Sequence, residues 1–340
     1  MLRKIGFERT SELVSALMEK GEVFAPVANS AGVNFQKIQE PGDVTLDFYN
    51  TLQSPKSVFF PQTDDMVRYR LTHEGTEAEE VPLDFEPRIV LGVRPCDVRS
   101  FEVMDRLFSG GGIVDPYWEN RRKNTTIIGY AFDKVDPADF YSTFGIGAAD
   151  PTGSDIFMVK GESAFLLKGI TEKGEEVLGS IDLIEDVSAK DKEYFEERLA
   201  GASLLETRTL ATEGTAEKLE AVFENPYWVG AAAPCLNCGV CTFVCPTCHC
   251  FDIQDETLFG KGVRRRIWDS CMFTDFTLHT SGHNPRTKKS QRLRQRINHK
   301  FSYYVTNFDV ISCVGCGRCI RSCPVHIDIV AVVEGAMALP

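Results

Sequence analysis

The sequence predicts an α+β protein in which a mixed α/β domain over residues 1–225 precedes a mainly α-helical domain over residues 226–340. The chain has 340 residues, a length that accommodates about two domains. With 43% hydrophobic and 25% charged residues, it can bury a core and is not a disordered chain. Cysteine usage separates the two parts, because eleven of the twelve cysteines lie between Cys235 and Cys323.

Helical periodicity and strand-length apolar runs alternate in the first domain. The first predicted helix is capped by Thr10 or Ser11, and Asp97 is the predicted N-cap of a later helix. A hairpin is predicted over 154–170 and a pair of helices over 187–224. The strand-length runs are 23–27, 57–60, 88–93 and 126–132. This domain has no phosphate-binding loop, so it does not by itself indicate a chemistry.

Two copies of the pattern Cys-x-x-Cys-x-x-Cys-x-x-x-Cys-Pro lie in the second part, beginning at Cys235 and Cys313. In two-cluster ferredoxins, the first three thiolates of such a motif bind one 4Fe-4S cluster, and the fourth binds the other cluster. This crossed arrangement predicts a ferredoxin-like dicluster domain. The predicted ligands are Cys235, Cys238, Cys241 and Cys323 for cluster 1, and Cys313, Cys316, Cys319 and Cys245 for cluster 2.

Residues around the motifs fit the same interpretation. Gly239, Gly315 and Gly317 allow the tight loops that a cluster requires, and Pro246 and Pro324 are predicted to start the helices that follow. Zinc also binds Cys-x-x-Cys pairs, but a zinc site requires neither a third cysteine at the same spacing nor a repeated Cys-Pro. Disulfides are not expected in a reducing compartment. Iron-sulfur clusters are therefore the favoured interpretation.

Four cysteines remain after the eight predicted ligands. Cys248, Cys250 and Cys271 lie close together in the sequence and are candidates for a third metal site or third iron-sulfur cluster. A fourth ligand for that site would come from Cys96, His249, His279 or His283. Two other interpretations stay open for the three cysteines: inert buried thiols and a redox-active thiol group. Cys96 alone is predicted to be structural.

Basic residues are concentrated in one segment of an acidic chain. The net charge is −12, but residues 261–300 contain eleven Lys and Arg residues and only two acids. Each four-thiolate cubane carries a net charge of about −2, so we expect residues 264–266 and 286–296 to compensate the clusters or to bind an acidic partner. The alternative is a nucleic-acid-binding protein with structural clusters, which would bind phosphate through residues 286–300. Because the whole chain is acidic, we expect no nucleic-acid partner.

We expect a cytoplasmic protein without a membrane span. No stretch approaches the roughly 18 consecutive apolar residues that a membrane-spanning helix requires. Near the N-terminus, Glu8, Glu12 and Glu19 interrupt the segment where a signal peptide would have its apolar core. A reducing compartment also agrees with cysteines that bind metal.

Several segments together resemble a known family. They are CGVCTFVCPTCHC from residue 238, RRRIWDSC from 264, the GHN and PRTKK strings over 282–289, and CVGCGRCIRSCP from 313. These segments are similar to the iron-sulfur beta subunit of soluble cytoplasmic nickel-iron hydrogenases of the sulfhydrogenase type. They are equally similar to the A subunit of anaerobic sulfite reductase, and related subunits accompany heterodisulfide-reductase-like complexes. The resemblance extends upstream through the Pro-Cys-Asp turn at 95–97 and the Phe-Phe pair at 59–60 to Ala25-Pro26-Val27, so it covers nearly the whole chain.

The resemblance implies an α-helical ferredoxin-like second domain and two kinds of partner. One is a ferredoxin-reductase-like subunit that binds FAD and NAD(P), and the other is a separate catalytic redox subunit. In some members it also implies further cysteines, near residues 133–147, as companions of the cysteine at position 96. This sequence has no cysteine over 133–147, so an N-terminal cluster at Cys96 is not expected.

The sequence contains no convincing nucleophile-base set and no flavin or nicotinamide fingerprint, so no catalytic residue is assigned. We therefore expect an electron-transfer subunit of an oxidoreductase complex that is not catalytic alone. It would relay single electrons between the flavin subunit and a terminal subunit of the hydrogenase, sulfite reductase or heterodisulfide-reductase type. The first domain would then be a docking module. The alternative within the redox class is sulfur or thiol chemistry at Cys248, Cys250 and Cys271.

Overall fold

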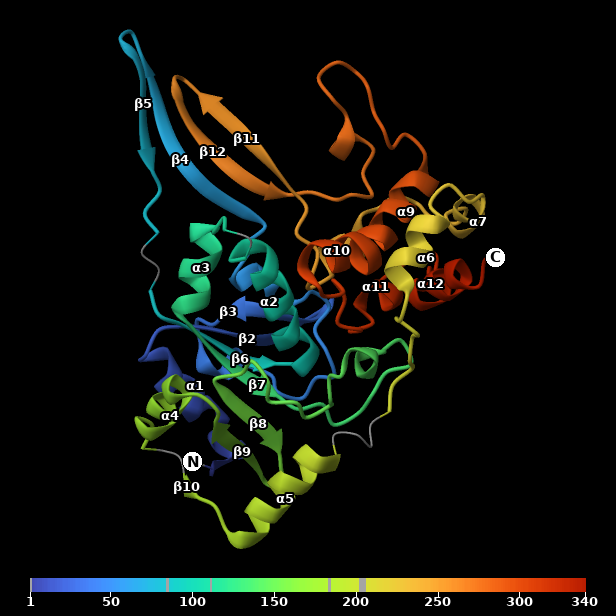
Figure 1. Cartoon of the computed structure of the whole chain (residues 1–340). Coiled ribbons are helices and arrows are strands. Elements are labelled where there is room, and N and C mark those ends of the chain that lie inside the picture. The colour runs from blue at the N-terminus through green and yellow to red at the C-terminus, as the bar shows by residue number, and fades with distance from the viewer. Residues whose placement is uncertain (1, 84–85, 111, 183–184, 202–205) are drawn as a thin grey trace.

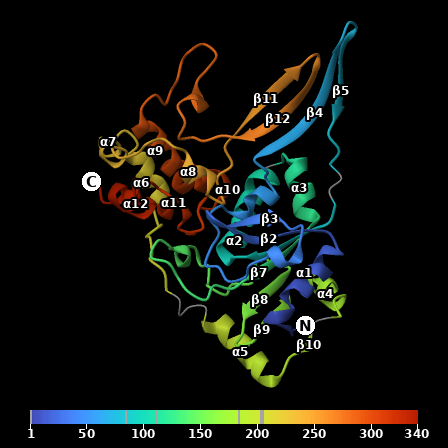
Figure 2. The same ribbon diagram turned by 180° about the vertical axis from the view of Figure 1, so that it is seen from behind.

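The structure is a computed structural model that describes residues 2–83, 86–110, 112–182, 185–201 and 206–340. Figure 1 shows an eight-stranded sheet with helices packed against it, a group of short helices that contains both cysteine motifs, and a four-stranded sheet that projects from the body. From behind, the projecting sheet and the helical group again lie on opposite sides of the molecule (Figure 2). The predicted mixed α/β character of the chain is confirmed.

The eight-stranded sheet has the order β10-β1-β9-β8-β7-β6-β2-β3. The four strands β2, β6, β7 and β8 are parallel to their neighbours in this group, and the outer pairings are antiparallel. β6 and β7 are buried along almost their whole length, because parallel central strands are covered on both faces. The strand bounds are β1 (Leu2–Gly6), β2 (Glu22–Asn29), β3 (Gly32–Lys37), β6 (Arg88–Val93), β7 (Thr125–Tyr130), β8 (Ile156–Lys160), β9 (Ala164–Gly169) and β10 (Glu185–Asp186).

Helices pack on both faces of this sheet, and the alternation of side chains along each strand decides which helix a residue contacts. Leu91 and Ile128 pack in the cluster that includes α1 and α4, whereas the adjacent Val90 and Ile127 pack with α2 and α3. α5 packs against β8 and β9 through Phe195. The bounds are α1 (Thr10–Met18), α2 (Pro95–Phe108), α3 (Pro116–Lys123), α4 (Glu172–Gly179) and α5 (Ala189–Ala200), with short 3-10 helices at Phe7–Arg9, Pro41–Asp43, Pro55–Val58 and Tyr141–Phe144.

The projecting sheet is built from two hairpins that are far apart in the sequence. Its order is β11-β12-β4-β5, and every pairing is antiparallel. The strands are β4 (Thr63–Thr72), β5 (Gly75–Glu80), β11 (Phe251–Leu258) and β12 (Lys261–Trp268). Buried ion pairs anchor the sheet to the body, because Asp64 of β4 binds Arg121 of α3 at 2.7 Å and Arg266 of β12 contacts Asp115, the N-cap of α3. The prediction of a helical second domain therefore misses the hairpin formed by β11 and β12.

The helical group surrounds its own apolar core. Trp228, Ile297, Phe301 and Val333 are buried there, together with Leu219 from α6. The bounds are α6 (Thr215–Ala221), α7 (Tyr227–Ala231), α8 (Val240–Phe243), α9 (Lys289–Asn298), α10 (Tyr304–Phe308), α11 (Arg318–Arg321) and α12 (Ile329–Met337), with a 3-10 helix at Asp275–Thr277 and a π-helical segment at His299–Tyr303.

Most predicted elements of the first part are confirmed. The first predicted helix, the hairpin over 154–170 and the helix pair over 187–224 correspond to α1, β8 with β9, and α5 with α6. The predicted cap at Thr10 or Ser11 is wrong, because α1 begins at Thr10 and its N-cap is Arg9. Three of the four predicted strands are also present as β2, β6 and β7. The predicted strand over 57–60 is wrong, because Pro55–Val58 form a 3-10 helix and Phe59 and Phe60 then pack as buried single residues.

The prediction that Asp97 is an N-cap is wrong, because α2 begins at Pro95 and its N-cap is Arg94. The Asp97 carboxylate instead accepts two hydrogen bonds from Arg318, at 2.6 and 2.7 Å. Both residues are almost completely buried, and the Arg318 guanidinium also donates to the Thr51 carbonyl at 2.8 Å. This bidentate pair joins α2 to the second cysteine motif, since Arg318 lies next to Cys319.

Asp97→Ala is predicted to lower the free energy of unfolding by about 3–5 kcal/mol, because it leaves the buried Arg318 guanidinium without its counter-charge. Chemical denaturation of the anaerobic protein measures this change. The control is Glu196→Ala, which removes an exposed ion pair with Lys168 and should cost about 0–1 kcal/mol. Equal effects of the two substitutions would show that the buried pair has no special role.

Candidate metal centres

Glycines shape both cysteine loops as predicted. Gly239 and Gly317 have φ of 75° and 67°, and they are the N-caps of the short helices α8 and α11. At Gly315, with φ of 63°, a Cβ atom would lie 2.4 Å from the backbone at Phe140 and Tyr141. Only glycine allows both this backbone conformation and this close approach.

The predicted helices at the two Cys-Pro steps are absent. Both Pro246 and Pro324 lead into turns, and α12 begins only at Ile329, where the Asp328 side chain caps it. The turn after Cys323 lets the backbone N–H of Ile327 lie 3.2 Å from the Cys323 sulfur. The fourth cysteine of the second motif therefore sits on a turn with a backbone donor beside its sulfur.

The structure gathers the predicted ligands around two small cavities. Cavity 1 is lined by Cys235, Cys238, Cys241 and Cys323, the four cysteines predicted for cluster 1. Cavity 2 is lined by Cys245, Cys313, Cys316 and Cys319, the four predicted for cluster 2. Cys319 and Arg296 line both cavities, so the two cavities are adjacent. The assignment of each cysteine as a ligand stays a prediction.

Buried donors test whether these cavities suit an anionic cluster. Arg296 is buried, and its Nε and Nη2 atoms have no hydrogen-bond partner within the described residues. Burial by itself lowers the pKa of this guanidinium, but the neighbouring thiolates, Cys241 first among them, raise it further than burial lowers it. A buried cation with unpaired N–H groups requires an anionic acceptor, and the sulfides of a cluster are such acceptors. The cavities therefore fit 4Fe-4S clusters.

Two lysines add further buried positive charge near Cys245, the fourth cysteine of the first motif. Lys300 Nζ lies 3.4 Å from the Cys245 sulfur and 2.8 Å from the Ser312 carbonyl oxygen. Lys56, from the first part of the chain, donates to the Cys248 carbonyl at 2.9 Å. Both lysines are buried, and neither has a carboxylate within ion-pair distance among the residues that the structure covers. Their positive charge is directed at the cysteine-rich centre.

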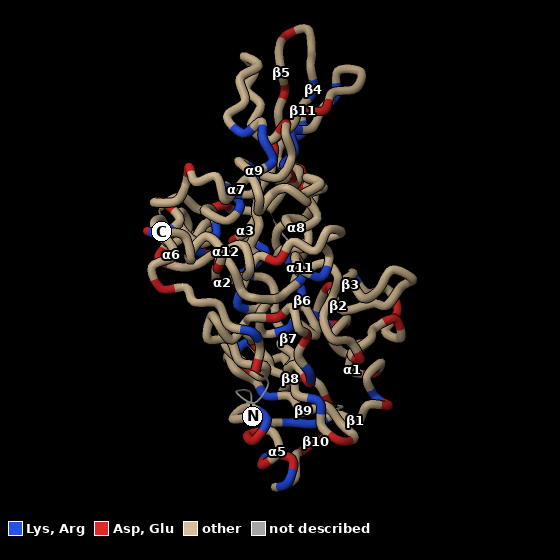
Figure 3. Tube along the Cα trace, turned by 90° about the vertical axis from the view of Figure 1, so that its right-hand side faces the viewer, with Lys and Arg blue, Asp and Glu red and all other residues tan. Residues whose placement is uncertain are grey.

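Only part of the basic segment has the predicted position. Arg264, Arg265 and Arg266 lie on β12, where they form ion pairs with acidic residues of the projecting sheet and α3. Figure 3 shows residues of both charge signs along that sheet. The prediction that 264–266 compensate the clusters is therefore wrong, whereas Arg296 on α9 lines both cavities.

Three of the remaining cysteines lie close to one another near cavity 2. Cys250 and Cys271 pack in the same apolar cluster, and Cys248 is a neighbour of Cys245, which lines cavity 2. The register of the β11–β12 hairpin brings Cys250 and Cys271 together, because Phe251 pairs with Trp268 at its base. In the described ranges, no group of three or more His, Cys, Asp or Glu side chains is arranged to hold a single metal ion, as distinct from a multi-iron cluster.

Cys96 and the histidines named as possible fourth ligands occupy different surroundings. Cys96 is fully buried in an apolar cluster with Phe132 and Cys316, and burial raises its pKa. His249 lies partly buried between Phe108 and His299, and its desolvation there lowers its pKa to about 3. His279 and His283 contact each other in an exposed loop. Cys96 thus faces the cavity 2 cysteines, not the group of Cys248, Cys250 and Cys271.

Sequence reasoning missed Lys56 and Arg318. Lys56 lies in the string SPKSVFF, where a single charged residue among small and apolar ones is the only local signal. Arg318 lies inside the second motif, whose cysteines account for its spacing without reference to the arginine. Both residues act across long sequence separations, which a single sequence does not reveal.

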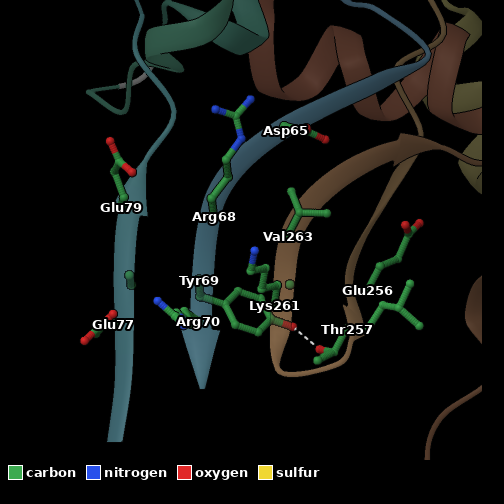
Figure 4. Close-up of a pocket in the computed structure, with 13 residues that line it drawn as sticks. Asp65, Arg68, Tyr69, Arg70, Glu77, Glu79, Glu256, Thr257, Lys261 and Val263 are labelled. Atoms are coloured by element: carbon green, nitrogen blue, oxygen red, sulfur yellow. Dashed lines mark hydrogen bonds between the residues drawn. The ribbon is translucent and has the colours of Figure 1, made fainter. Parts of the chain in front are cut away.

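A separate groove of about 830 Å³ lies on the projecting sheet (Figure 4). It contains no cysteine, and its lining includes Arg68, Arg70, Glu77 and Glu79. The Tyr69 side chain crosses the sheet beside Gly262 to reach the Thr257 hydroxyl, as the dashed line in the figure shows. The charged lining distinguishes this groove from the two cysteine-lined cavities.

The fold and the two cysteine-lined cavities are those of an iron-sulfur protein, and comparison with known proteins gives its family. Residues 234–327 match the family described as a 4Fe-4S dicluster domain, so two 4Fe-4S clusters are the cofactors of this chain. The whole chain is 32% identical to sulfhydrogenase 2 subunit beta of Pyrococcus furiosus over 345 residues, which cover 97% of each protein. The chain belongs to the family of this sulfhydrogenase beta subunit and is an iron-sulfur electron-transfer subunit. No solved structure shows a significant match.

The structure also bears on membrane association. Among the helices of the described residues, none combines the length and the apolar composition needed to cross a bilayer.

Arg296→Gln is predicted to lower the reduction potentials of both clusters by roughly 50–100 mV, because a buried positive charge shared by the two cavities favours the reduced, more negative state. A redox titration followed by electron paramagnetic resonance (EPR) measures both potentials. The control is Arg294→Gln on the same helix, where Arg294 is paired with Glu224. Equal shifts in the two variants would contradict the assigned position of Arg296.

Proposed function

We propose that this chain relays single electrons through two adjacent 4Fe-4S clusters within a multi-subunit oxidoreductase. Cys235, Cys238, Cys241 and Cys323 would hold cluster 1, and Cys313, Cys316, Cys319 and Cys245 would hold cluster 2. The observation that carries the proposal is the pair of cysteine-lined cavities that share Cys319 and Arg296. When bound, the clusters supply one-electron redox chemistry at neighbouring centres.

The residues of the chain then have defined tasks. Cysteine thiolates hold the irons, and Arg296 and Lys300 provide buried positive charge around them. The close contact of Gly315 with the backbone at 140–141 and the pair between Asp97 and Arg318 fix the second motif against the α/β part. The α/β part, residues 1–225, is proposed to be the docking module and residues 226–340 the cluster-binding domain.

The proposed partners are a ferredoxin-reductase-like subunit that binds FAD and NAD(P), and a catalytic redox subunit. Because the related Pyrococcus furiosus protein is a sulfhydrogenase subunit, a hydrogenase-type catalytic subunit is the favoured terminal partner over a sulfite reductase or heterodisulfide reductase type. The proposed location is the cytoplasm.

Crossed ligation predicts which substitutions share a phenotype. The anaerobically purified protein should contain about eight irons if it holds two cubanes. Cys245→Ser and Cys316→Ser should both perturb the EPR signal of cluster 2 and leave that of cluster 1, because their side chains line the same cavity. Cys238→Ser and Cys323→Ser should do the reverse.

Two outcomes would contradict this assignment. If each motif held its own cluster, Cys245→Ser would resemble Cys238→Ser instead of Cys316→Ser. Zinc in place of iron, without acid-labile sulfide, would reject the clusters altogether.

A second function is supported by the three cysteines outside the two ligand sets. Cys250 packs against Cys271, and Lys56 donates to the Cys248 carbonyl, an arrangement that favours sulfur and thiol redox chemistry at Cys248, Cys250 and Cys271. A third metal centre is the alternative. By contrast, phosphate binding by residues 286–300 is disfavoured, because Arg292, Arg296 and Lys300 are buried.

Cys271→Ser separates these possibilities. If the three cysteines carry out sulfur chemistry, the substitution should abolish turnover of polysulfide by the complex while both cluster signals and about eight irons remain. If they bind a third cluster, the wild-type protein should contain about twelve irons and the variant about eight. Unchanged turnover with unchanged iron would identify inert structural thiols. The matched control is Cys96→Ser, which alters a buried thiol outside this group.

A further inference from the structure

We propose that electrons enter or leave this chain at cluster 1, through a docking face that fits a redox protein with acidic residues around its own electron-transfer group. The docking face consists of Leu236, Cys238, Lys288 and Lys289. This inference rests on the proposed function, because it assumes that cavity 1 holds a cluster. It adds which of the two clusters meets a partner and what the partner's surface is like.

The two cavities differ in their exposure to solvent. Cys238 of cavity 1 is exposed, and its other three proposed ligands are partly exposed. In cavity 2, Cys245 and Cys316 are buried, and Phe140 from the α/β part lines the cavity. The backbone at 140–141 also closes on Gly315 in the same loop. A partner protein can therefore approach cluster 1 closely, whereas the α/β part covers cluster 2.

An exposed apolar side chain lies at the open cavity. Leu236 lines cavity 1 and is 62% exposed. Single exposed apolar residues are ordinary, but this one lies beside the exposed ligand Cys238 in the lining of the same cavity, and it gives the face an apolar centre such as protein interfaces commonly have.

The basic residues of the docking face adjoin this centre. Lys289, at the start of α9, donates hydrogen bonds to the Ala233 carbonyl and, at 3.5 Å, to the Cys235 carbonyl. α9 also packs directly against α7. In Figure 1 both helices lie on the side of the molecule away from the projecting sheet. The apolar centre and the basic rim therefore form one continuous face.

The charge of this face is not neutralised. Residues 225–251, 276–308 and 310–327 contain no Asp or Glu, although the chain as a whole has a net charge of −12. Within the described residues, no ion pair is formed by Lys288 or Lys289, whereas Arg264 and Arg265 on the projecting sheet are both paired. Arg294 is paired with Glu224 and adds no net charge. A basic rim around an exposed redox centre selects an acidic partner.

Charged inorganic oxidants test the face without a partner protein. The holoprotein is reduced, and its oxidation is followed by stopped-flow absorbance with ferricyanide or with the tris(phenanthroline)cobalt(III) cation. Each reduced cluster gives one electron to one oxidant, which becomes ferrocyanide or the cobalt(II) complex. At low ionic strength we expect the ferricyanide rate to fall roughly fivefold or more in the variant Lys288→Glu. The cobalt rate should rise, and added salt should remove both effects.

A matched control is Lys190→Glu on α5, an exposed lysine whose substitution makes the same change in charge. Its two rates should stay within about twofold of wild type, because α5 lies at the opposite end of the molecule from α9 in Figures 1 and 3. If Lys288→Glu behaves like this control while both EPR signals remain, the docking face is rejected and the two-cluster function stands. If the wild-type protein has no cluster signals, the proposed function itself fails.

Discussion

Buried positive charge around the cysteine cavities is the constraint on which the rest of this structure depends. Arg296, Lys300 and Lys56 are all removed from water, and none has a carboxylate partner among the described residues. Such an arrangement is costly unless anionic groups compensate it, and thiolate-bound clusters supply that negative charge. We therefore expect cluster insertion and folding to be coupled, because folding buries these positive charges and the clusters supply the negative charge that compensates them.

The same charges connect regions that are distant in sequence. Lys56 reaches from the first part of the chain to the carbonyls of Thr242 and Cys248, and Asp97 binds Arg318 beside the second motif. Both contacts are buried, so small displacements of the α/β part would disturb the cluster-binding loops. The α/β part consequently acts on the cluster environment directly, in addition to its proposed role in docking.

The sequence predicted the features that depend on local spacing. The cysteine repeats predicted two groups of four, and the positive φ angles of Gly239 and Gly317 followed from the tight loops. It failed where long-range contacts decide. No strand is predicted over residues 251–268, although β12 pairs with β4, almost two hundred residues earlier in the chain. Asp97 resembled a helix cap because nothing local indicates its ion pair with Arg318.

The β11–β12 hairpin makes the positions of the Cys250 and Cys271 thiols independent of the number of residues between them. Pairing of Phe251 with Trp268 at its base fixes the strands that lead to Cys250 and Cys271. Residues added in matched pairs beyond this base would lengthen the projection by about 3.4 Å per pair without moving either sulfur. The outer part of the hairpin can thus change in length during evolution while the thiol geometry at its base is retained.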